Sequence, residues 1–413
     1  MNRSMLIIIF ILMLNLIYAG EKRKAADAFI NHDVKKAISI MKQYSKENPE
    51  DAEAYFYLGR YLHYAQYDVG KRVYDEKISN KIINYLDKAI SITDTIGNAY
   101  YYIGVEYGMR GHYAFMENDT IKSKQEFGLG REKGGYPDWL LEYAKNVLKS
   151  CKKDAILFTG GDAEANSIWY LQFVKHYRRD VSVVPMALMS YVPFITFVNS
   201  GINNYFIPIH TGLNDKEIEK MGLRLYKCDS ADLMISDEAK KQYNLKDDYI
   251  MKWQLKPDCV FKGKEIIMPG TDILLHILKN NKWSRPVYFT VASQPNLRAN
   301  LGDFLRTEGL CLHLLPIRKD EKIFIEPKIT ANILMNKGNL KNYPSVKNHN
   351  MPRCNMVLIN YLYILIKLYN YYNNINEHNN AEKTLTFIKD NIDIGIIRYK
   401  DKLRSYLDSL YKE

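Results

Sequence analysis

Residues 154–184 read DAILFTGGDAEANSIWYLQFVKHYRRDVSVV, and this stretch decides the fold class of the surrounding chain. An apolar run over residues 155–159 ends at a glycine pair, a helix-like segment follows over residues 163–177, and a β-branched run covers residues 181–188. A strand, a glycine turn, a helix and a second strand form the unit from which parallel α/β sheets are built. The stretch therefore predicts a sheet of this kind.

The α/β domain that we predict covers residues 151–328. Apolar runs and helical spacing recur along it and indicate its further elements. Strands are predicted over residues 206–210, 286–290 and 310–315, and helices over residues 190–198, 214–221, 271–280 and 301–307. The alternation of strands and helices predicts a mostly parallel sheet with helices on both faces.

Residues 25–150, ahead of this domain, carry a helical pattern. Two segments share one spacing: a tyrosine, an apolar residue three positions on, a glycine directly after it, and a large residue three positions further. They contain Tyr55, Leu58, Gly59 and Leu62, and Tyr100, Ile103, Gly104 and Tyr107. The glycines would let a neighbouring helix approach closely, and the pattern resembles a tetratricopeptide-repeat array.

Residues 329–413 return to a helical pattern. The segment over residues 356–372 is strongly apolar, but Asn360, Lys367 and Asn370 interrupt it. We therefore interpret it as a buried repeat helix and not as a membrane span, which needs about 20 apolar residues. A C-terminal helical repeat region completes the predicted α plus α/β fold class.

Residues 1–19 have the organisation of a signal peptide. Arg3 supplies a positive charge, an apolar run follows, and Ala19 precedes a suitable cleavage site. We therefore expect an exported protein, periplasmic or extracellular. An uncleaved N-terminal anchor is the alternative, and membrane association is expected only in that case.

The formal net charge of +11 would suit a nucleic-acid-binding protein. The basic residues are spread along the chain, however, and neither zinc-finger spacing nor an aromatic RNA-binding motif occurs, so we expect no nucleic-acid partner. The five cysteines contain no CxxC pair, which argues against a zinc ribbon or redox motif. One or two disulfides and buried free thiols are both compatible with the sequence.

Polar residues near the predicted strand ends are the candidates for a ligand-binding site, because ligands of open parallel sheets bind outside the carboxyl ends of the strands. The candidates are Gly160, Gly161, Asp162, Glu164, Asn166, Trp169, His210 and Arg285. The two glycines could bring backbone N–H groups to an anion. Their turn lacks the lysine of a P-loop and the third glycine of a dinucleotide fingerprint.

Asp162 and Glu164 could act as an acid and a base or hold a metal ion. The structural alternative is that Asp162 caps the helix and that Glu164 favours the positive end of the helix dipole. The sequence contains no histidine pair with metal-ligand spacing and no nucleophile elbow. We therefore expect no cofactor and no metal, and we assign no catalytic residue.

The repeat-like tyrosines have two interpretations. Helix packing accounts for them most simply. Tetratricopeptide arrays also present a concave groove that holds peptides or partner proteins. Tyr55, Tyr100 and Tyr107 are therefore candidate partner-groove residues.

Four further motifs carry a resemblance to a known family. They are AILFTGGD over residues 155–162, WYLQ over residues 169–172, WSRPVYF over residues 283–289 and EGLCLHLLP over residues 308–316. Their order resembles the soluble C-terminal part of a bacterial membrane-protein family of unknown function, distantly similar to protein O-mannosyltransferases. Typical members carry a multi-pass membrane region where this chain has a signal sequence and repeats. The resemblance therefore does not imply sugar transfer here.

These observations favour an exported, non-catalytic interaction or scaffold protein of the bacterial envelope, with an envelope protein or peptide as its partner. The alternative is a carbohydrate-binding accessory, or an enzyme, of a glycosylation pathway that acts through the α/β domain. A third interpretation makes the α/β part a degenerate domain that only supports the repeats.

Overall fold

The computed structural model describes residues 20–67, 74–318, 324–396 and 400–411, so the predicted signal peptide lies outside the described residues. The chain divides into two compact units. The first unit is made of the described residues up to Tyr113, with Gly128–Tyr136 and Met351–Arg353, and the second is made of Ala114–Phe127, Pro137–Asn350 and the residues from Cys354 onward. The division differs from the three predicted parts, because residues 137–150 and the C-terminal helices belong to the same unit as the sheet.

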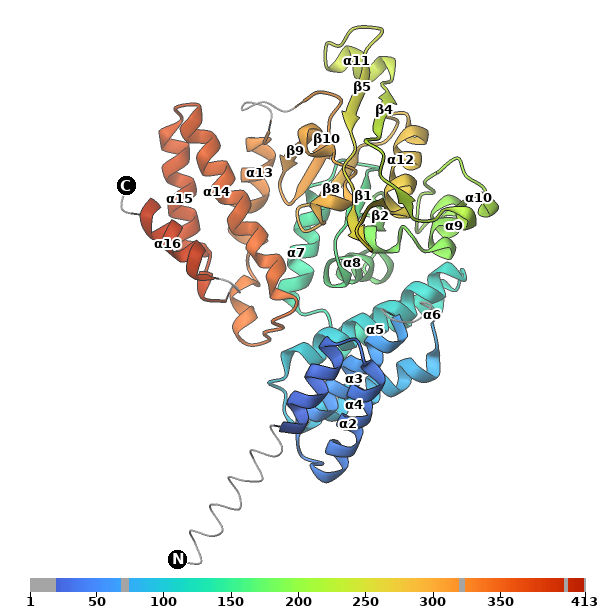
Figure 1. The fold of residues 1–413 in the computed structure, drawn as a ribbon. Coiled ribbons are helices and arrows are strands. Elements are labelled where there is room, and N and C mark those ends of the chain that lie inside the picture. Colours follow the sequence, from blue (N-terminus) through green and yellow to red (C-terminus); the bar gives the residue numbers. More distant parts are fainter. Residues whose placement is uncertain (1–19, 68–73, 319–323, 397–399, 412–413) are drawn as a thin grey trace, which may run out of the picture. The chain divides into compact units, whose positions relative to one another are not determined.

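The first unit is a helical array. Residues 20–30 are helical, and four longer helices follow. These are α2 (Val34–Glu47), α3 (Ala52–Tyr67), α4 (Glu76–Ile92) and α5 (Gly97–Met116) (Figure 1). The end of α5 belongs to the second unit, and α6 (Thr120–Glu132) begins in the second unit and ends in the first. Asp33 begins α2 by accepting a hydrogen bond from the Lys36 backbone N–H at 3.1 Å. The core between α2 and α3 contains Met41 and Leu58, both fully buried.

Glycines set the close approaches in this array. A Cβ atom on Gly59 of α3 would lie 2.8 Å from Leu86 Cδ2 of α4, so the predicted close approach of a neighbouring helix is confirmed there. At Gly104 the neighbour is different: a Cβ atom would lie 2.8 Å from the carbonyl oxygen of Gly135, in the turn after α6. The Tyr136 hydroxyl fixes this turn by donating to the Gly104 carbonyl at 2.7 Å.

The main sheet of the second unit has five strands in the order β2-β1-β8-β10-β9. They are β1 (Ile156–Thr159), β2 (Ser182–Pro185), β8 (Val287–Thr290), β9 (Leu305–Glu308) and β10 (Cys311–Leu314). β1 pairs in parallel with both β2 and β8, as predicted, whereas β10 pairs antiparallel with β8 and with β9. The sheet is therefore mixed, and the prediction of a mostly parallel sheet is wrong for the half made of β8, β10 and β9.

The hairpin of β9 and β10 explains the difference. Glu308 pairs with Cys311, so only two residues connect the strands, and Gly309 between them has a φ of 58°. A two-residue turn with a left-handed first residue joins antiparallel strands. The predicted helix over residues 301–307 is correspondingly reduced to a 3₁₀ turn over Leu301–Phe304, after which the chain enters β9.

Helices surround this sheet. They include α7 (Asp138–Lys149), α8 (Asp162–Trp169), a π-helical turn over Tyr170–Val174, α9 (Val192–Ser200), α10 (Asp215–Lys220) and α12 (Pro269–Asn281). α8 lies in the connection from β1 to β2, and α12 lies in the connection from β2 to β8, so both parallel pairs are joined through helices. Residues 206–210, predicted as a strand, contain only an isolated bridge between Phe206 and Ile202, so this prediction is wrong.

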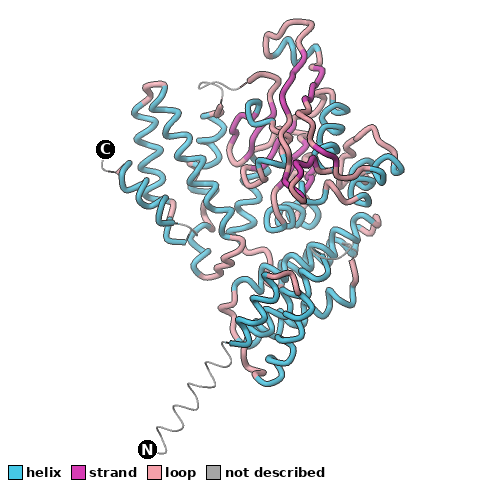
Figure 2. Tube along the Cα trace, in the orientation of Figure 1, coloured by secondary structure: helices cyan, strands magenta, loops and turns pink. Residues whose placement is uncertain are grey.

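Residues 224–267 form antiparallel pieces that the sequence analysis did not predict (Figure 2). β3 (Arg224–Leu225), β7 (Lys264–Ile267) and β6 (Cys259–Phe261) make a small sheet, and β4 (Ser230–Met234) pairs with β5 (Ile250–Gln254) across α11 (Asp237–Gln242). Buried and exposed residues alternate along β4 and β5, the pattern of a ribbon with one covered face.

The C-terminal helices pack in the same unit as the sheet. They are α13 (Pro327–Leu334), α14 (Ile359–Asn374), α15 (His378–Asn391) and α16 (Lys400–Leu410), and α14 packs along α15 (Figure 1). No helix among the described residues has both the length and the apolarity that a bilayer crossing requires. The cysteines are free, and the closest approach between two of them, Cys151 Sγ to Cys311 Sγ, is 3.8 Å.

α7 is tied by buried hydrogen bonds to α14 and to the segment before it. The Asn146 amide donates to the Asn339 carbonyl at 2.6 Å and to the Tyr361 hydroxyl at 2.8 Å. The Asn342 backbone N–H donates to the Glu142 carboxylate at 3.0 Å. Both Asn146 and Glu142 are almost fully buried, so these bonds satisfy groups that cannot reach water.

Candidate functional site

The carboxyl ends of β1 and β8 meet where the chain switches direction across the sheet, the usual ligand position in such folds. Here the backbone itself occupies that position. Gly160 follows β1, and a Cβ atom on it would lie 2.9 Å from the Ala292 carbonyl oxygen in the loop after β8. Glycine is therefore needed at residue 160 because the two loops touch at this point.

Glu164 lies beneath this contact. It is 1% exposed, and its carboxylate accepts hydrogen bonds from the Gly160 backbone N–H at 2.9 Å, the Thr290 hydroxyl at 2.7 Å and the Tyr143 hydroxyl at 3.1 Å. Burial raises the pKa of Glu164, and the three hydrogen bonds oppose that rise only in part. The side chain thus joins α8 to β1, β8 and α7.

The same network reaches α14 and the loop after β8. Tyr143 accepts a hydrogen bond from the Asn360 amide at 3.1 Å, and burial holds the pKa of Tyr143 well above its usual value. Arg298 favours the ionised form of Glu164 through its charge and donates to the Ser293 hydroxyl at 2.9 Å. Burial lowers the pKa of Arg298 to about 10. The arrangement is a buried structural junction whose donors and acceptors face one another.

The remaining candidates on α8 lie on two sides of the helix. Gly161, and not Asp162, is the N-cap, which corrects the predicted capping role of Asp162; Asp162 is exposed in the first turn. Asn166 and Trp169 are buried, and the Trp169 ring stacks on Phe173 with centroids 6.3 Å apart. Of these candidates, the structure brings Gly160 and Glu164 into direct contact.

Arg285 lies at the opposite, amino end of the strands. Its guanidinium donates to the Asp154 carbonyl at 2.7 Å, the Ala155 carbonyl at 3.1 Å and the Ser182 hydroxyl at 2.7 Å, which ties together the starts of β1 and β2. Burial lowers the pKa of Arg285 to about 10. His210 is exposed on the loop after α9.

The candidate partner residues of the helical array differ in exposure. Tyr55 is half-buried on α3, where its ring stacks on Tyr85 at 6.4 Å and the Lys88 ammonium lies 5.8 Å from its centroid. Tyr100 is also half-buried, and that burial raises its pKa. Tyr107 is 7% exposed and belongs to the core. Two of the three candidates therefore reach the surface.

A second buried carboxylate, Glu308, lies on the main sheet. It accepts hydrogen bonds from His313 Nδ1 at 2.9 Å, from the Tyr288 hydroxyl at 2.8 Å and from Arg306 at 2.6 Å. Burial disfavours its charge, but the bonds from His313, Arg306 and Tyr288 outweigh burial and lower the pKa of Glu308 to about 2. Across the described ranges, no three His, Cys, Asp or Glu side chains gather where they could share a metal ion.

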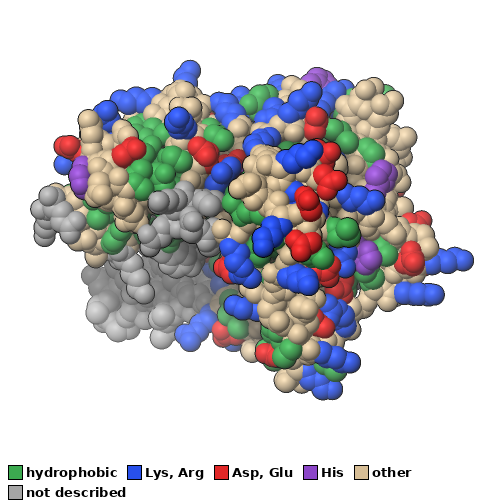
Figure 3. Space-filling model, turned by 90° about the horizontal axis from the view of Figure 1, so that it is seen from above, with side chains coloured by type: hydrophobic (Ala, Val, Ile, Leu, Met, Phe, Trp, Pro, Cys, Tyr) green, Lys and Arg blue, Asp and Glu red, His purple; other side chains and the backbone are tan. Residues whose placement is uncertain are grey.

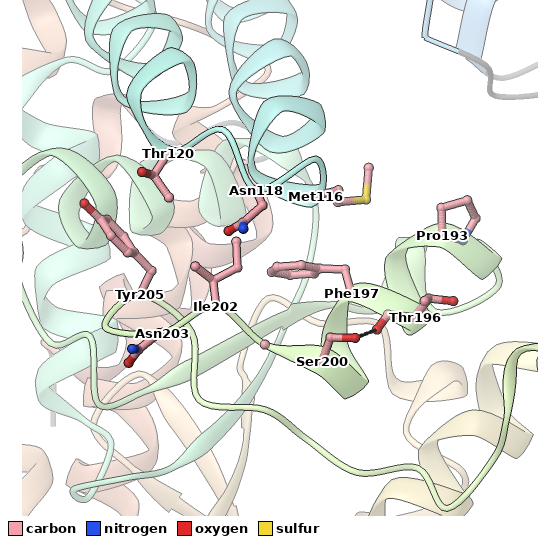
Figure 4. Close-up of a pocket in the computed structure, with 11 residues that line it drawn as sticks. Met116, Asn118, Thr120, Pro193, Thr196, Phe197, Ser200, Ile202, Asn203 and Tyr205 are labelled. Carbon is pink, nitrogen blue, oxygen red and sulfur yellow. Dashed lines mark hydrogen bonds between the residues drawn. The ribbon is translucent and has the colours of Figure 1, made fainter.

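Two adjoining hollows, each of about 570 Å³, lie around the loop between α9 and residue 208. They share Ser200, Ile202, Asn203 and Tyr205. The first hollow is also lined by the chain between α5 and α6, and Figure 4 shows its residues. Ser200 is held in place by its bond to the Thr196 carbonyl at 3.0 Å, the dashed line in that view. The sequence analysis did not predict this region as a site.

Tyr205 stands between two cations in this region. The Arg179 guanidinium carbon lies 4.3 Å from the ring centroid, and the Lys124 ammonium lies 5.5 Å from it. Lys124, as a nearby hydrogen-bond donor, and then Arg179 favour the phenolate and lower the pKa of Tyr205. The three residues come from distant segments, and no motif in the sequence connects them.

The comparisons with known proteins concern the second unit. The family model described as TMEM260-associated domain 2 matches residues 140–256 and 233–333. This region, from α7 to α13, is therefore similar to the C-terminal region of TMEM260-like proteins. The searches of curated proteins and of solved structures found no match.

Proposed function

We propose that this chain is an exported scaffold protein of the bacterial envelope, which binds a protein or peptide partner through its helical array. The buried junction at Glu164 is the observation that supports a non-catalytic role. Gly160 touches the loop after β8, and Glu164 accepts three hydrogen bonds from the protein itself. The polar groups of Gly160 and Glu164 at the strand ends therefore stabilise the fold, and the Glu164 carboxylate faces the protein interior.

The helical array supports the partner-binding part. The spacing around Gly59 and its close approach to Leu86 suit a tetratricopeptide-like pairing of α3 with α4. Half-exposed tyrosines lie along α3, and cations lie beside their rings: Lys88 at Tyr55, and Arg60 at 5.7 Å from Tyr64. Tyrosine and arginine are the residues most often responsible for binding energy at protein interfaces. Export rests on the N-terminal sequence.

A photo-crosslinking experiment in cells tests this proposal. A benzophenone amino acid replaces Tyr55 or Tyr100 in turn, and Tyr363, which is 50% exposed on α14, serves as the matched control. We expect one discrete envelope-protein adduct at the array positions and none at the control position. Equal or absent adducts at all three positions, with the protein folded and exported, would contradict the proposal.

The carbohydrate-binding alternative has one observation in its favour. The hollow beside Tyr205 carries the amide groups of Asn118 and Asn203 and the hydroxyl groups of Thr120 and Ser200, which suit a polar ligand. A thermal-shift screen with neutral sugars tests it, since a ligand at a hundred times its Kd adds about 2.7 kcal/mol. If the sugar binds at the strand ends, Asp162→Asn should abolish the shift without changing the melting temperature of the free protein.

A further inference from the structure

We propose that the adjoining hollows around Tyr205 form a binding site for the phosphate group of a small organic phosphate ester. The proposal does not depend on the partner surface of the helical array. It rests on three features of the second unit: the hollows themselves, two cations that form no ion pair with any described residue, and a first hollow with polar side chains at one end and Met116 and Pro193 toward the other.

The hollows have the size of a small-molecule site. Each is about 570 Å³, within the range of roughly 300–1,000 Å³ that ligand pockets usually have. They share Tyr205 and Asn203, so both open on the same loop. Gly201, with a φ of 64°, begins this loop after α9, and its Cβ position would lie 2.7 Å from the Phe206 carbonyl oxygen. The loop that presents Tyr205 is therefore tightly folded on itself.

Lys124 and Arg179 bring positive charge to this loop. Within the part of the chain that the structure describes, neither forms an ion pair. Arg179 Nε donates to the Gln172 carbonyl at 3.1 Å, and its Nη2 atom is buried without a hydrogen-bond partner among the described residues. Buried donors are normally satisfied, so an unpartnered guanidinium N–H indicates that positive potential is left uncompensated here.

The carboxylates near the hollows are engaged elsewhere. Asp180 forms an ion pair with Arg178 at 2.8 Å. Asp154 acts electrostatically on Arg285, and Asp215 accepts the Thr196 hydroxyl at 3.1 Å. Among the described residues, none of the three forms an ion pair with Lys124 or Arg179, although Asp154 and Asp180 line the second hollow together with Arg179. The same two cations lower the pKa of Tyr205.

The two ends of the first hollow differ in chemistry. Figure 4 shows Tyr205, Asn203 and Thr120 grouped at one end and Met116 and Pro193 toward the other. A phosphate dianion beside Tyr205, where the two hollows adjoin, would lie near the Arg179 guanidinium, which lines the second hollow, and near the Lys124 ammonium, which contacts the Tyr205 ring. The Tyr205 phenol and the neutral donors of the first hollow would complete the set that its three acceptor oxygens require. The apolar side chains of Met116 and Pro193, which Figure 4 shows near Thr196, would receive the organic part of the ester.

The test is isothermal titration calorimetry with phenyl phosphate, in parallel with inorganic phosphate and with phenol. Vesicles containing phosphatidic acid form a further arm, because a lipid headgroup carries the same phosphomonoester. We expect phenyl phosphate to bind more tightly than inorganic phosphate, and phenol not to bind. Binding to the vesicles alone, lost in the same variants, would assign the phosphate to a lipid headgroup.

Two variants and a matched control identify the site. Lys124→Gln and Arg179→Gln should each weaken phosphate binding about tenfold, which corresponds to about 1.4 kcal/mol. Lys175→Gln should leave it unchanged, although Lys175 also lies over a tyrosine ring, that of Tyr170 at 5.8 Å. Lys124→Gln is decisive if Arg179→Gln fails to fold. The proposal is overturned if no phosphate probe binds at millimolar concentration, or if Lys124→Gln binds as tightly as the wild type.

Discussion

Replacing Glu164 by alanine and by glutamine distinguishes a structural junction from an ordinary buried acid. Alanine leaves three buried donors, those of Gly160, Thr290 and Tyr143, without an acceptor. Each unsatisfied donor costs about 1–3 kcal/mol, so we expect a loss of at least about 3 kcal/mol. In a domain of this size, about 2–4 °C of melting temperature is lost per kcal/mol, which gives a fall of roughly 10 °C.

The Glu164→Gln substitution should destabilise the protein much less than Glu164→Ala. The glutamine amide oxygen can still accept from Gly160 and Thr290, and only the bond from Tyr143 must rearrange, at a cost of about 1 kcal/mol. Glutamine also removes the desolvation penalty that raises the pKa of Glu164. We therefore expect Glu164→Gln to lie within about 1 kcal/mol of the wild type at neutral pH.

The contribution of Glu164 to the free energy of unfolding depends on pH with a definite sign. Because its folded-state pKa is raised, Glu164 binds its proton more tightly in the folded protein. Its stabilising contribution is complete below the unfolded pKa of about 4.3 and is lost as the pH rises through the folded value. Urea unfolding of both variants and the wild type between pH 4 and 8 measures these effects. If Glu164→Ala were as stable as the wild type, or if Glu164→Gln were as damaged as Glu164→Ala, the reasoning would be refuted.

Three further predictions concern other contacts of the second unit. Gly160→Ala should cost about 1–3 kcal/mol because its Cβ meets backbone, whereas Gly161→Ala, which meets nothing within 4 Å, should change the unfolding free energy by under about 1 kcal/mol. Arg285→Ala should lower the melting temperature by several degrees through the loss of four hydrogen bonds, while Arg318→Ala, 59% exposed, should shift it by less than a degree or two. The folded-state pKa of Glu308, about 2, lies below its unfolded value, so stability should fall as the pH drops from about 4.5 toward 2. Glu308→Gln should flatten that fall, and acid titration followed by circular dichroism would show whether it does.

The parallel half of the main sheet could be predicted from the sequence because its strands are short apolar runs between turn residues. β1 and β8 are fully buried, and such strands have no polar alternation to confuse with a helix. β9 was missed because Arg306 and Glu308 make its sequence look polar. Their charges are compensated by each other and by His313, a cross-strand arrangement that a local pattern cannot reveal.

The candidate site shows the same limit. Gly160 and Glu164 were expected to lie near each other at a strand end, and they do. Whether a strand-end acid faces a ligand or the protein depends on distant residues, here Tyr143 and Thr290, which the local pattern does not contain. Tyr205 was missed for a related reason, since its two cations come from separate segments.

The hydrogen bonds of α7 carry a consequence for how the protein is made. Asn146 and Glu142 find their partners about 200 residues later, at Asn339 and Asn342. At roughly 5–20 residues per second, the ribosome needs on the order of 10–40 s to supply those partners after α7 has emerged. During that interval the Asn146 and Glu142 side chains bond to water, and the apolar residues of α7 that are buried in the folded chain lack part of their cover, which invites chaperone binding. A fragment that stops at residue 333, where the family match ends, would remain in that condition permanently.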